Sequence, residues 1–392
     1  MTAINKTRIT SIDLLRGIIM ILMALDHTRD YFHASAFVFD PTDLTKTSTP
    51  IFLTRWITHY CAPIFMLLTG AAAFLVGDRK GVKALSKFLF TRGLFLVLME
   101  HTVINFGWNF NIHFPEFDFL VIWSLGVSMI ALAGLVYLPK KLILAIGIIL
   151  LAGHNLLDNV HVAGKGLSAF FWSLLHEPGS FSIAGKNIFV MYPVIPWVGI
   201  IALGYSLGSL YANNVDVAQR KKTLLWLGIG SIILFVSIRF INVYGDPSPW
   251  SKQPGDAFTL LSFINVTKYP PSLLYGLITL GPACIFLALF ETRLGWLGKI
   301  FSVYGRVPMF YYILHIYIIH LLAMFATTFC GHKWSDMVWT NLIYNDKLIG
   351  YGFSLGVVYL VWIVVLLMLY PLCKWYDRYK TNHKEKWWLS YL

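Results

Sequence analysis

Residues 11–27 read Ser-Ile-Asp-Leu-Leu-Arg-Gly-Ile-Ile-Met-Ile-Leu-Met-Ala-Leu-Asp-His, and this run decides the class of fold. It is an apolar stretch that nevertheless carries Arg16, Asp26 and His27. Ionisable groups are costly inside a membrane-crossing helix, so they usually mark a functional site there. The eleven-residue separation puts Arg16 and His27 about 20° apart around a helix and about 16 Å apart along it. One helix face therefore presents a cation and an imidazole about half a bilayer apart, which suits a long anionic ligand.

The composition places the chain among integral membrane proteins. Of its 392 residues, 57% are hydrophobic and 13% are charged, against about 25% charged in soluble domains, and the mean hydropathy is +0.66. In a soluble protein the net charge of +12 would suggest nucleic acid as a partner. The excess of Lys and Arg on the cytoplasmic side of membrane proteins is a simpler cause. We therefore expect a lipid bilayer as a partner and no nucleic acid.

Ten apolar stretches are long enough to cross a hydrocarbon core of about 30 Å. They are residues 9–26, 54–76, 84–104, 119–138, 141–157, 189–211, 223–241, 270–290, 301–325 and 348–372. No linker or low-complexity segment divides the chain. The sequence therefore predicts an all-α, polytopic integral membrane protein with about ten transmembrane helices. These helices form a single integral-membrane domain, residues 1–392, whose first span is uncleaved.

The placement of Lys and Arg predicts the orientation. With a cytoplasmic N-terminus, 21 of the 31 Lys and Arg residues lie at inner ends and loops, and 10 lie outside although the outer loops are longer. This asymmetry predicts a multi-pass protein of the cytoplasmic (inner) membrane with both termini in the cytoplasm. It puts five polar, aromatic segments on the outer face: 27–53, 105–118, 158–188, 242–269 and 326–347.

Asp26, His27 and His33 lie close together in the sequence where the first span leaves the membrane. An imidazole beside a carboxylate is the usual composition of a general base, because the carboxylate orients the ring and stabilises its protonated form. In this hypothesis Asp26 orients the base, and either His27 or His33 is the catalytic histidine. The alternative interpretation is a hydrated, hydrogen-bonded helix end.

Arg16, Arg92 and Arg306 enter the first, third and ninth stretches from the cytoplasmic side. Because guanidinium groups recognise phosphate well, we expect these three residues to bind the phosphates of a cytosolic ligand. Each has a structural alternative. Arg16 lies three residues after Asp13, which allows an intrahelical ion pair, and the other two could anchor their helices as snorkelling side chains.

Further histidine and aromatic residues complete the candidate site. His315 shares a helix face with Tyr311 and is counted with the donor-binding residues, although it has no obvious partner at its depth. The alternative interpretation is a buried histidine that is satisfied by a neighbouring helix. Aromatic rings that stack and polar groups that hydrogen-bond suit a carbohydrate-like acceptor, whereas an interfacial aromatic belt is the alternative. The residues expected to bind the acceptor are Glu100, His101, Trp250, Lys268 and Tyr269.

Three motifs together resemble a known family. They are Ser11-Ile-Asp-Leu-Leu-Arg-Gly17, Tyr31-Phe-His-Ala-Ser35 and Gly305-Arg-Val-Pro-Met-Phe-Tyr-Tyr-Ile-Leu-His315. They resemble the bacterial branch of the heparan-α-glucosaminide N-acetyltransferase family, over nearly the whole chain. The spacing of Arg16 and His27 is also similar to the Arg-x10-His motif of the transmembrane O-acyltransferases that decorate surface glycans.

The resemblance implies acetyl transfer from cytosolic acetyl-CoA to an amino or hydroxyl group of an extracytoplasmic, sugar-containing acceptor. His33 matches the catalytic histidine of the family by its Phe-His-Ala-Ser setting, whereas His27 matches the histidine of the O-acyltransferase motif. Both stay candidates, with a slight preference for His33. The extended lumenal region that precedes the first span in the lysosomal enzyme has no counterpart here, which weakens heparan sulfate as the expected acceptor.

The sequence therefore predicts an acyl-CoA-dependent acyltransferase with acetyl-CoA as co-substrate. Direct transfer and an acyl-histidine intermediate are both compatible with it, as is a homo-oligomer. The four cysteines are scattered without a CxxC pair, so we expect no metal. A secondary transporter of a small solute is the alternative, because helices broken by glycine and proline around embedded charges are common in transporters. Gly204, Gly208 and Pro308 would be such breaks.

Overall fold

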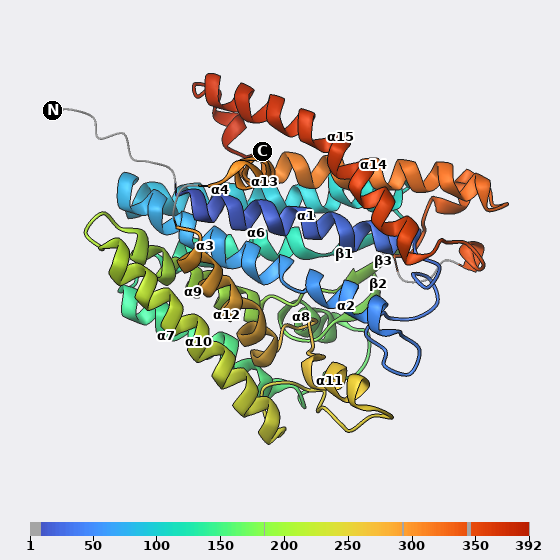
Figure 1. Cartoon of the computed structure of the whole chain (residues 1–392), viewed down its shortest axis with the longest axis horizontal. Coiled ribbons are helices and arrows are strands. Elements are labelled where there is room, and N and C mark those ends of the chain that lie inside the picture. The colour runs from blue at the N-terminus through green and yellow to red at the C-terminus, as the bar shows by residue number, and fades with distance from the viewer. Residues whose placement is uncertain (1–8, 184, 292–293, 343–345, 392) are drawn as a thin grey trace.

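The computed structural model describes residues 9–183, 185–291, 294–342 and 346–391. It is mostly helical, as predicted, and its long helices lie side by side in a bundle (Figure 1). Three of the cations counted for the orientation, Lys6, Arg8 and Arg293, lie outside the described residues. The helices in chain order are α1 (Thr10–Phe32), α2 (Thr49–Thr58), α3 (Cys61–Lys80), α4 (Val82–Met99), α5 (Asn105–Asn109), α6 (Val121–Leu135), α7 (Lys140–Gly153), α8 (Leu167–Leu175), α9 (Ile195–Gly208), α10 (Val217–Ile241), α11 (Asp256–Ile264), α12 (Leu273–Leu289), α13 (Trp296–Arg306), α14 (Pro308–Phe329) and α15 (Leu355–Asn382).

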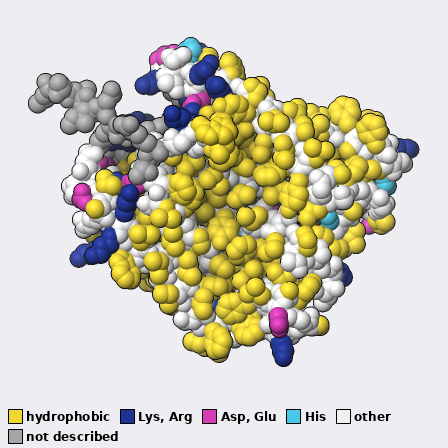
Figure 2. All heavy atoms as spheres, in the orientation of Figure 1, with side chains coloured by type: hydrophobic (Ala, Val, Ile, Leu, Met, Phe, Trp, Pro, Cys, Tyr) yellow, Lys and Arg dark blue, Asp and Glu magenta, His cyan; other side chains and the backbone are white. Residues whose placement is uncertain are grey.

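The face of the bundle shown in Figure 2 is largely apolar, as contact with a bilayer requires. Hydrophobic side chains cover most of the face in Figure 2, and charged side chains gather at its margins. Five helical segments of the described chain are long and apolar enough to cross a membrane: Thr49–Lys80, Lys140–Leu157, Val217–Ile241, Pro308–Phe329 and Leu355–Asn382. Each of the ten predicted stretches coincides with at least one helix. The number of spans stays a prediction, because the other helices are shorter or carry more charge.

Several of the predicted stretches are interrupted. The ninth stretch divides into α13 and α14, because Pro308 at the start of α14 has no N–H to continue the hydrogen bonding of α13. The sixth begins as strand β3 (Lys186–Val190), and its helix starts only at Ile195. In the third, a π-helical turn at Glu100–Ile104 separates α4 from α5. Turns of this kind are rare in proteins, and those that occur often lie at functional sites.

Helix α1 is packed against α3, α13, α14 and α15, so its polar side chains face protein rather than lipid. Glycines permit its closest approach. A Cβ atom at Gly17 would lie 2.0 Å from the Phe301 carbonyl oxygen, and one at Gly305 would lie 2.1 Å from the Asp13 carbonyl oxygen. Small residues allow helix backbones to approach closely in membranes. This contact also brings Arg16 and Arg306, the neighbours of the two glycines, to one level of the bundle.

A three-stranded sheet departs from the predicted all-α class. Strand β1 (Glu116–Phe119) pairs in parallel with β3, which pairs antiparallel with β2 (Gly179–Ile183). The strands are only four or five residues long and lie mainly in segments interpreted as outer loops, so a search for spanning stretches overlooks them. In Figure 1 the sheet lies at the end of the bundle opposite the start of α1.

Candidate functional site

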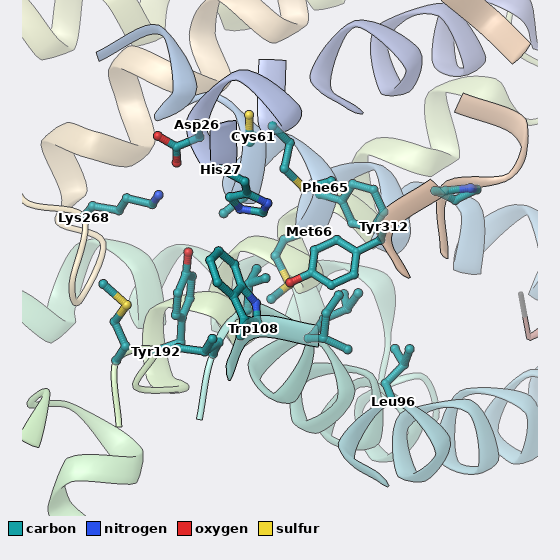
Figure 3. A pocket seen from close by; sticks show the side chains of 18 of the residues that line it. Asp26, His27, Cys61, Phe65, Met66, Leu96, Trp108, Tyr192, Lys268 and Tyr312 are labelled. Atoms are coloured by element: carbon teal, nitrogen blue, oxygen red, sulfur yellow. The ribbon is translucent and has the colours of Figure 1, made fainter. Parts of the chain in front are cut away.

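A cavity of about 770 Å³ runs alongside α1 from one end of the bundle toward the sheet. Its lining includes Arg16 near the start of α1 and His27 near its end, so the two residues highlighted by the sequence share one cavity. The remaining walls come from α2, α3, α4, α5, α6, α13, α14 and α15, from β3, and from loops that include residues 36–41, 191–192, 268–269, 339 and 342. Figure 3 shows His27 pointing into this space, with Trp108 and Tyr312 beside it and Lys268 on its other side.

The end of the cavity near the start of α1 is lined by cations. Arg16, Arg92 and Arg306, the three predicted phosphate ligands, all line it, and Lys380 of α15 joins them. Arg16 donates to the Gly305 carbonyl at 3.1 Å and lies 3.5 Å from Asp13, which is the ion pair named above as its structural alternative. Arg306 is held by Asp377 of α15 at 2.7 Å. Four cations from four helices make this end attractive to a polyanion.

His27 and His315 are joined by a direct hydrogen bond. Nδ1 of His27 lies 2.7 Å from Nε2 of His315, and Nδ1 of His315 lies 3.1 Å from the Tyr311 carbonyl oxygen. The expectation that His315 has no partner at its depth is therefore wrong. His315 does not line the cavity itself but lies behind His27. His315 therefore acts on the site through His27 and does not contact the cavity directly.

This chain of hydrogen bonds assigns the protons of two neutral imidazoles. A carbonyl oxygen only accepts, so Nδ1 of His315 carries hydrogen and its Nε2 has the lone pair. Nδ1 of His27 must then donate, which leaves Nε2 of His27 with its lone pair. The ring of Trp108 packs edge-on against His27, with their centroids 4.7 Å apart. An oriented imidazole with a free lone pair at a cavity wall has the form of a general base.

Asp26 lines the cavity, but its described bonds go to residues other than His27. Its carboxylate lies 2.8 Å from Nη2 of Arg29 and 2.6 Å from Nη1 of Arg55, and it accepts from the Thr58 hydroxyl at 2.8 Å. In this geometry His315 orients the His27 ring, whereas Asp26 forms ion pairs with Arg29 and Arg55. Arg55 and Arg29 also line the cavity.

His33 lies outside the cavity lining, directly after α1. Its Nδ1 accepts from the Ser35 backbone N–H at 3.1 Å and is 2.7 Å from the Ser35 hydroxyl. The lone pair of Nδ1 is thus already used, and Nε2 carries the proton of the neutral ring. Burial, with a contribution from the Arg29 charge, lowers the pKa of His33. The residue is 7% exposed, and its ring hydrogen-bonds within the turn that follows α1.

Lys268 and Tyr269 form the other end of the cavity, together with Tyr192. The hydroxyls of Tyr192 and Tyr269 are 3.5 Å apart, and Arg55 donates to the Tyr269 hydroxyl at 3.4 Å. Burial opposes ionisation of Tyr269, but the Lys268 and Arg55 cations lower the pKa of its phenol. The sheet positions this end, because the backbone N–H of Tyr192 donates to the Phe119 carbonyl at the end of β1.

Three of the predicted acceptor residues lie away from the cavity lining. Glu100 is fully buried and accepts from the backbone N–H of Trp123 at 2.7 Å, near the start of α6. His101 packs against Phe119 with ring centroids 4.6 Å apart. Trp250 packs on Phe263 beside α11. Their expected contact with an acceptor has no support in this geometry, because each is engaged by the local fold.

Several residues of the site escaped the sequence interpretation. Arg55 lies inside a predicted span and offered the same signal as Arg16, a charge within an apolar stretch. Tyr192 and Lys380 offered none, since nothing in the sequence relates them to α1. Trp108 follows the π-helical turn, which changes the direction of the side chains after it.

The geometry can be compared with known families. Residues 8–238 match the catalytic region of heparan-alpha-glucosaminide N-acetyltransferase, which is more than half of the chain. The chain belongs to this family. The matched region contains Arg16, Asp26, His27, His33 and Arg92 but ends before the elements that carry His315, Arg306 and Lys268. No individual curated protein matches the chain. Family membership implies a membrane-bound acetyltransferase that uses acetyl-CoA as co-substrate.

Proposed function

We propose that this acetyltransferase, a member of the bacterial branch of its family, moves the acetyl group of cytosolic acetyl-CoA to an extracytoplasmic acceptor. The acceptor is an amino or hydroxyl group of a sugar-containing molecule. The observation that carries the proposal is the single cavity that joins a cluster of cations to His27 along α1. In the proposed orientation both termini are cytoplasmic, so the cations lie toward the cytoplasm and His27 lies toward the outer face of the inner membrane.

The cationic end suits the phosphates of CoA. Arg16, Arg92, Arg306 and Lys380 surround one end of the cavity, and guanidinium groups bind phosphate oxygens in a directional way. From Arg16 the cavity reaches His27 over about 16 Å of helix, a distance that an extended pantetheine arm can follow. Between the two ends the wall is largely apolar, with Phe65, Met66 and Leu96 labelled in Figure 3. Such a wall suits an uncharged chain that carries a thioester.

His27 is proposed as the general base. The acceptor donates its N–H or O–H to Nε2 of His27 and loses the proton to it, while its nitrogen or oxygen forms a bond with the acetyl carbonyl carbon. The carbon–sulfur bond then breaks, and the departing CoA thiolate takes up a proton. His315 keeps Nδ1 of His27 as a donor, so the reactive nitrogen stays directed at the cavity. An acyl-histidine intermediate on the same nitrogen is the other route.

The opposite end suits a sugar. Lys268, Tyr269 and Tyr192 combine hydroxyl, ammonium and aromatic groups at the cavity wall, and Trp339 and Phe37 add further rings from the outer loops. Aromatic faces pack on sugar rings, while hydroxyl and charged groups hydrogen-bond with sugar hydroxyls. Asp26, Arg29 and Arg55 form a connected charge network beside this end. We propose that it fixes the acceptor against His27.

The test is acetyl transfer by the purified protein. The protein is incubated with radiolabelled acetyl-CoA and a panel of amino sugars and glycan precursors, and acceptor-dependent release of free CoA is measured. His27→Ala should lose about 10²- to 10⁴-fold in turnover while it still binds acetyl-CoA, as expected for loss of a general base. Uptake of a solute by proteoliposomes without any acyl transfer would overturn the proposal in favour of a transporter.

A further inference from the structure

Three potential metal ligands meet outside the cavity. His154 begins the 3-10 turn that follows α7, Asp158 ends that turn, and His176 ends α8. One nitrogen or oxygen atom from each lies within 4.8 Å of the others. This is the one such group of histidine, cysteine and carboxylate residues in the described part of the chain. None of the three residues lines the cavity.

Two of the three ligands, His154 and Asp158, are held from behind by a second contact. Nε2 of His154 lies 2.9 Å from the Pro271 carbonyl, which only accepts, so this nitrogen carries the proton and Nδ1 keeps the lone pair. One oxygen of Asp158 accepts from the Asn155 amide at 2.8 Å, which leaves its other oxygen for the cluster. Metal-binding histidines and carboxylates are usually oriented by outer contacts of this kind.

Both histidines of the cluster have a ring nitrogen that lacks the partner that burial demands. His154 and His176 are 2% and 3% exposed, and Nδ1 of each is buried without a hydrogen-bond partner among the described residues. Nε2 of His176 lies 3.4 Å from Oδ1 of Asp158. That is longer than an ordinary charge-assisted hydrogen bond of about 2.7–2.9 Å. It is close to the edge, about 3.3–3.6 Å, of a tetrahedron whose ligands lie about 2.0–2.2 Å from zinc.

We propose that His154, Asp158 and His176 bind one divalent transition-metal ion, with Zn²⁺ the best match. Two imidazoles and one carboxylate are ligands that Zn²⁺ accepts, and three protein ligands leave a fourth position for water. The inference departs from the expectation of no metal, which considered only the cysteines. It is independent of the proposed acetyl transfer, since the cluster shares no residue with the cavity.

The ion would stabilise the acceptor end of the cavity through the second contacts. His154 holds the Pro271 carbonyl, and the Asn155 side chain accepts from the Leu273 backbone N–H at 3.0 Å. Both contacts fix the segment directly after Lys268 and Tyr269, which line the cavity. Metal at this cluster therefore joins the end of α7, the end of α8 and the start of α12.

The test is metal binding by the full chain, purified in detergent with a tag that lacks histidine and stripped with a chelator. Titration with Co²⁺ should give visible absorption bands that saturate at one equivalent, and Zn²⁺ should abolish them by competition. His176→Ala and Asp158→Asn should each weaken binding by more than about 100-fold, because loss of an outer contact alone typically costs 10- to 100-fold. His161→Ala is the matched control, since His161 is nearby but exposed and paired with Glu177.

A second readout separates binding from folding. Zn²⁺ should raise the unfolding temperature of the wild type and of His161→Ala, and should slow amide exchange in residues 268–276 of both. Neither effect should occur in Asp158→Asn, whose side chain is nearly isosteric with the original. Equal Co²⁺ binding by the wild type and both ligand variants, or no saturable binding by the folded wild type, would overturn the proposal and leave a simple His176–Asp158 ion pair.

Discussion

Replacing His315 by leucine tests how the base is prepared. In the native protein, Nδ1 of His27 donates to Nε2 of His315 over 2.7 Å, so Nε2 of His27 keeps its lone pair. Leucine removes the acceptor and leaves a buried N–H unsatisfied, at a cost of about 1–3 kcal/mol. The ring of His27 avoids this cost by moving its proton to Nε2, which blocks the base. The productive tautomer, and with it kcat, should fall by about 5- to 150-fold.

The assay separates this effect from binding. Release of CoA thiol gives kcat, and calorimetry with acetyl-CoA gives donor affinity, which His315→Leu should leave unchanged because His315 does not line the cavity. His315→Gln is the matched control, since its amide oxygen can accept from Nδ1 of His27 and should restore most of the lost turnover. His33→Ala is the second control, and it should change kcat by less than tenfold.

The reverse pattern would refute the reasoning. If folded His315→Leu keeps kcat within about twofold of the wild type while His33→Ala loses more than 100-fold, the base is His33 and the hydrogen-bond chain at His27 is structural. That result would also restore the assignment preferred by the sequence motif, in which the Phe-His-Ala-Ser setting identifies the catalytic histidine.

Three further predictions follow from other parts of the structure. Arg16→Ala should weaken CoA binding by about 10- to 150-fold in calorimetry, because a hydrogen bond to a charged group contributes about 1.5–3 kcal/mol. Unchanged affinity would assign Arg16 a structural role through its contacts with Asp13 and the Gly305 carbonyl. Gly305→Val should lower the free energy of unfolding by about 1–3 kcal/mol or more in detergent, since its Cβ would meet the Asp13 carbonyl oxygen at 2.1 Å, whereas Gly134→Val, which enters open space, should not. Burial, followed by the charge of Glu116, raises the pKa of Asp118. The unfolding temperature of the wild type should therefore fall as pH rises above the ordinary carboxyl value of 3.8, and Asp118→Asn should flatten this pH profile. An unaltered slope in the variant would contradict the prediction.

The helices were predictable because hydropathy and helical period are local properties. Each of the ten apolar stretches coincides with a helix, and the placement of Arg16 and His27 along one cavity follows from a spacing within one helix. The sheet was not predictable in the same way. Its parallel pair joins Glu116 to Asn187 across 71 residues, and strands this short leave only a weak pattern. Contacts of this range depend on how the helices pack, which hydropathy does not report.

The candidate site also contains features that a local sequence pattern can predict and contacts that it cannot. His27 and His315 are 288 residues apart, and no local pattern relates them. Asp26, in contrast, was expected to orient His27, and this expectation conflicts with the geometry of a helix, which is known without a structure. Consecutive residues of a helix point in directions about 100° apart, so a carboxylate at position 26 does not face an imidazole at position 27. Residues three apart do face each other, and Arg29 is indeed the intrahelical partner of Asp26. Adjacency in the sequence suggested a base and its carboxylate; helical geometry instead separates a charge network on one side of α1 from a histidine pair on the other.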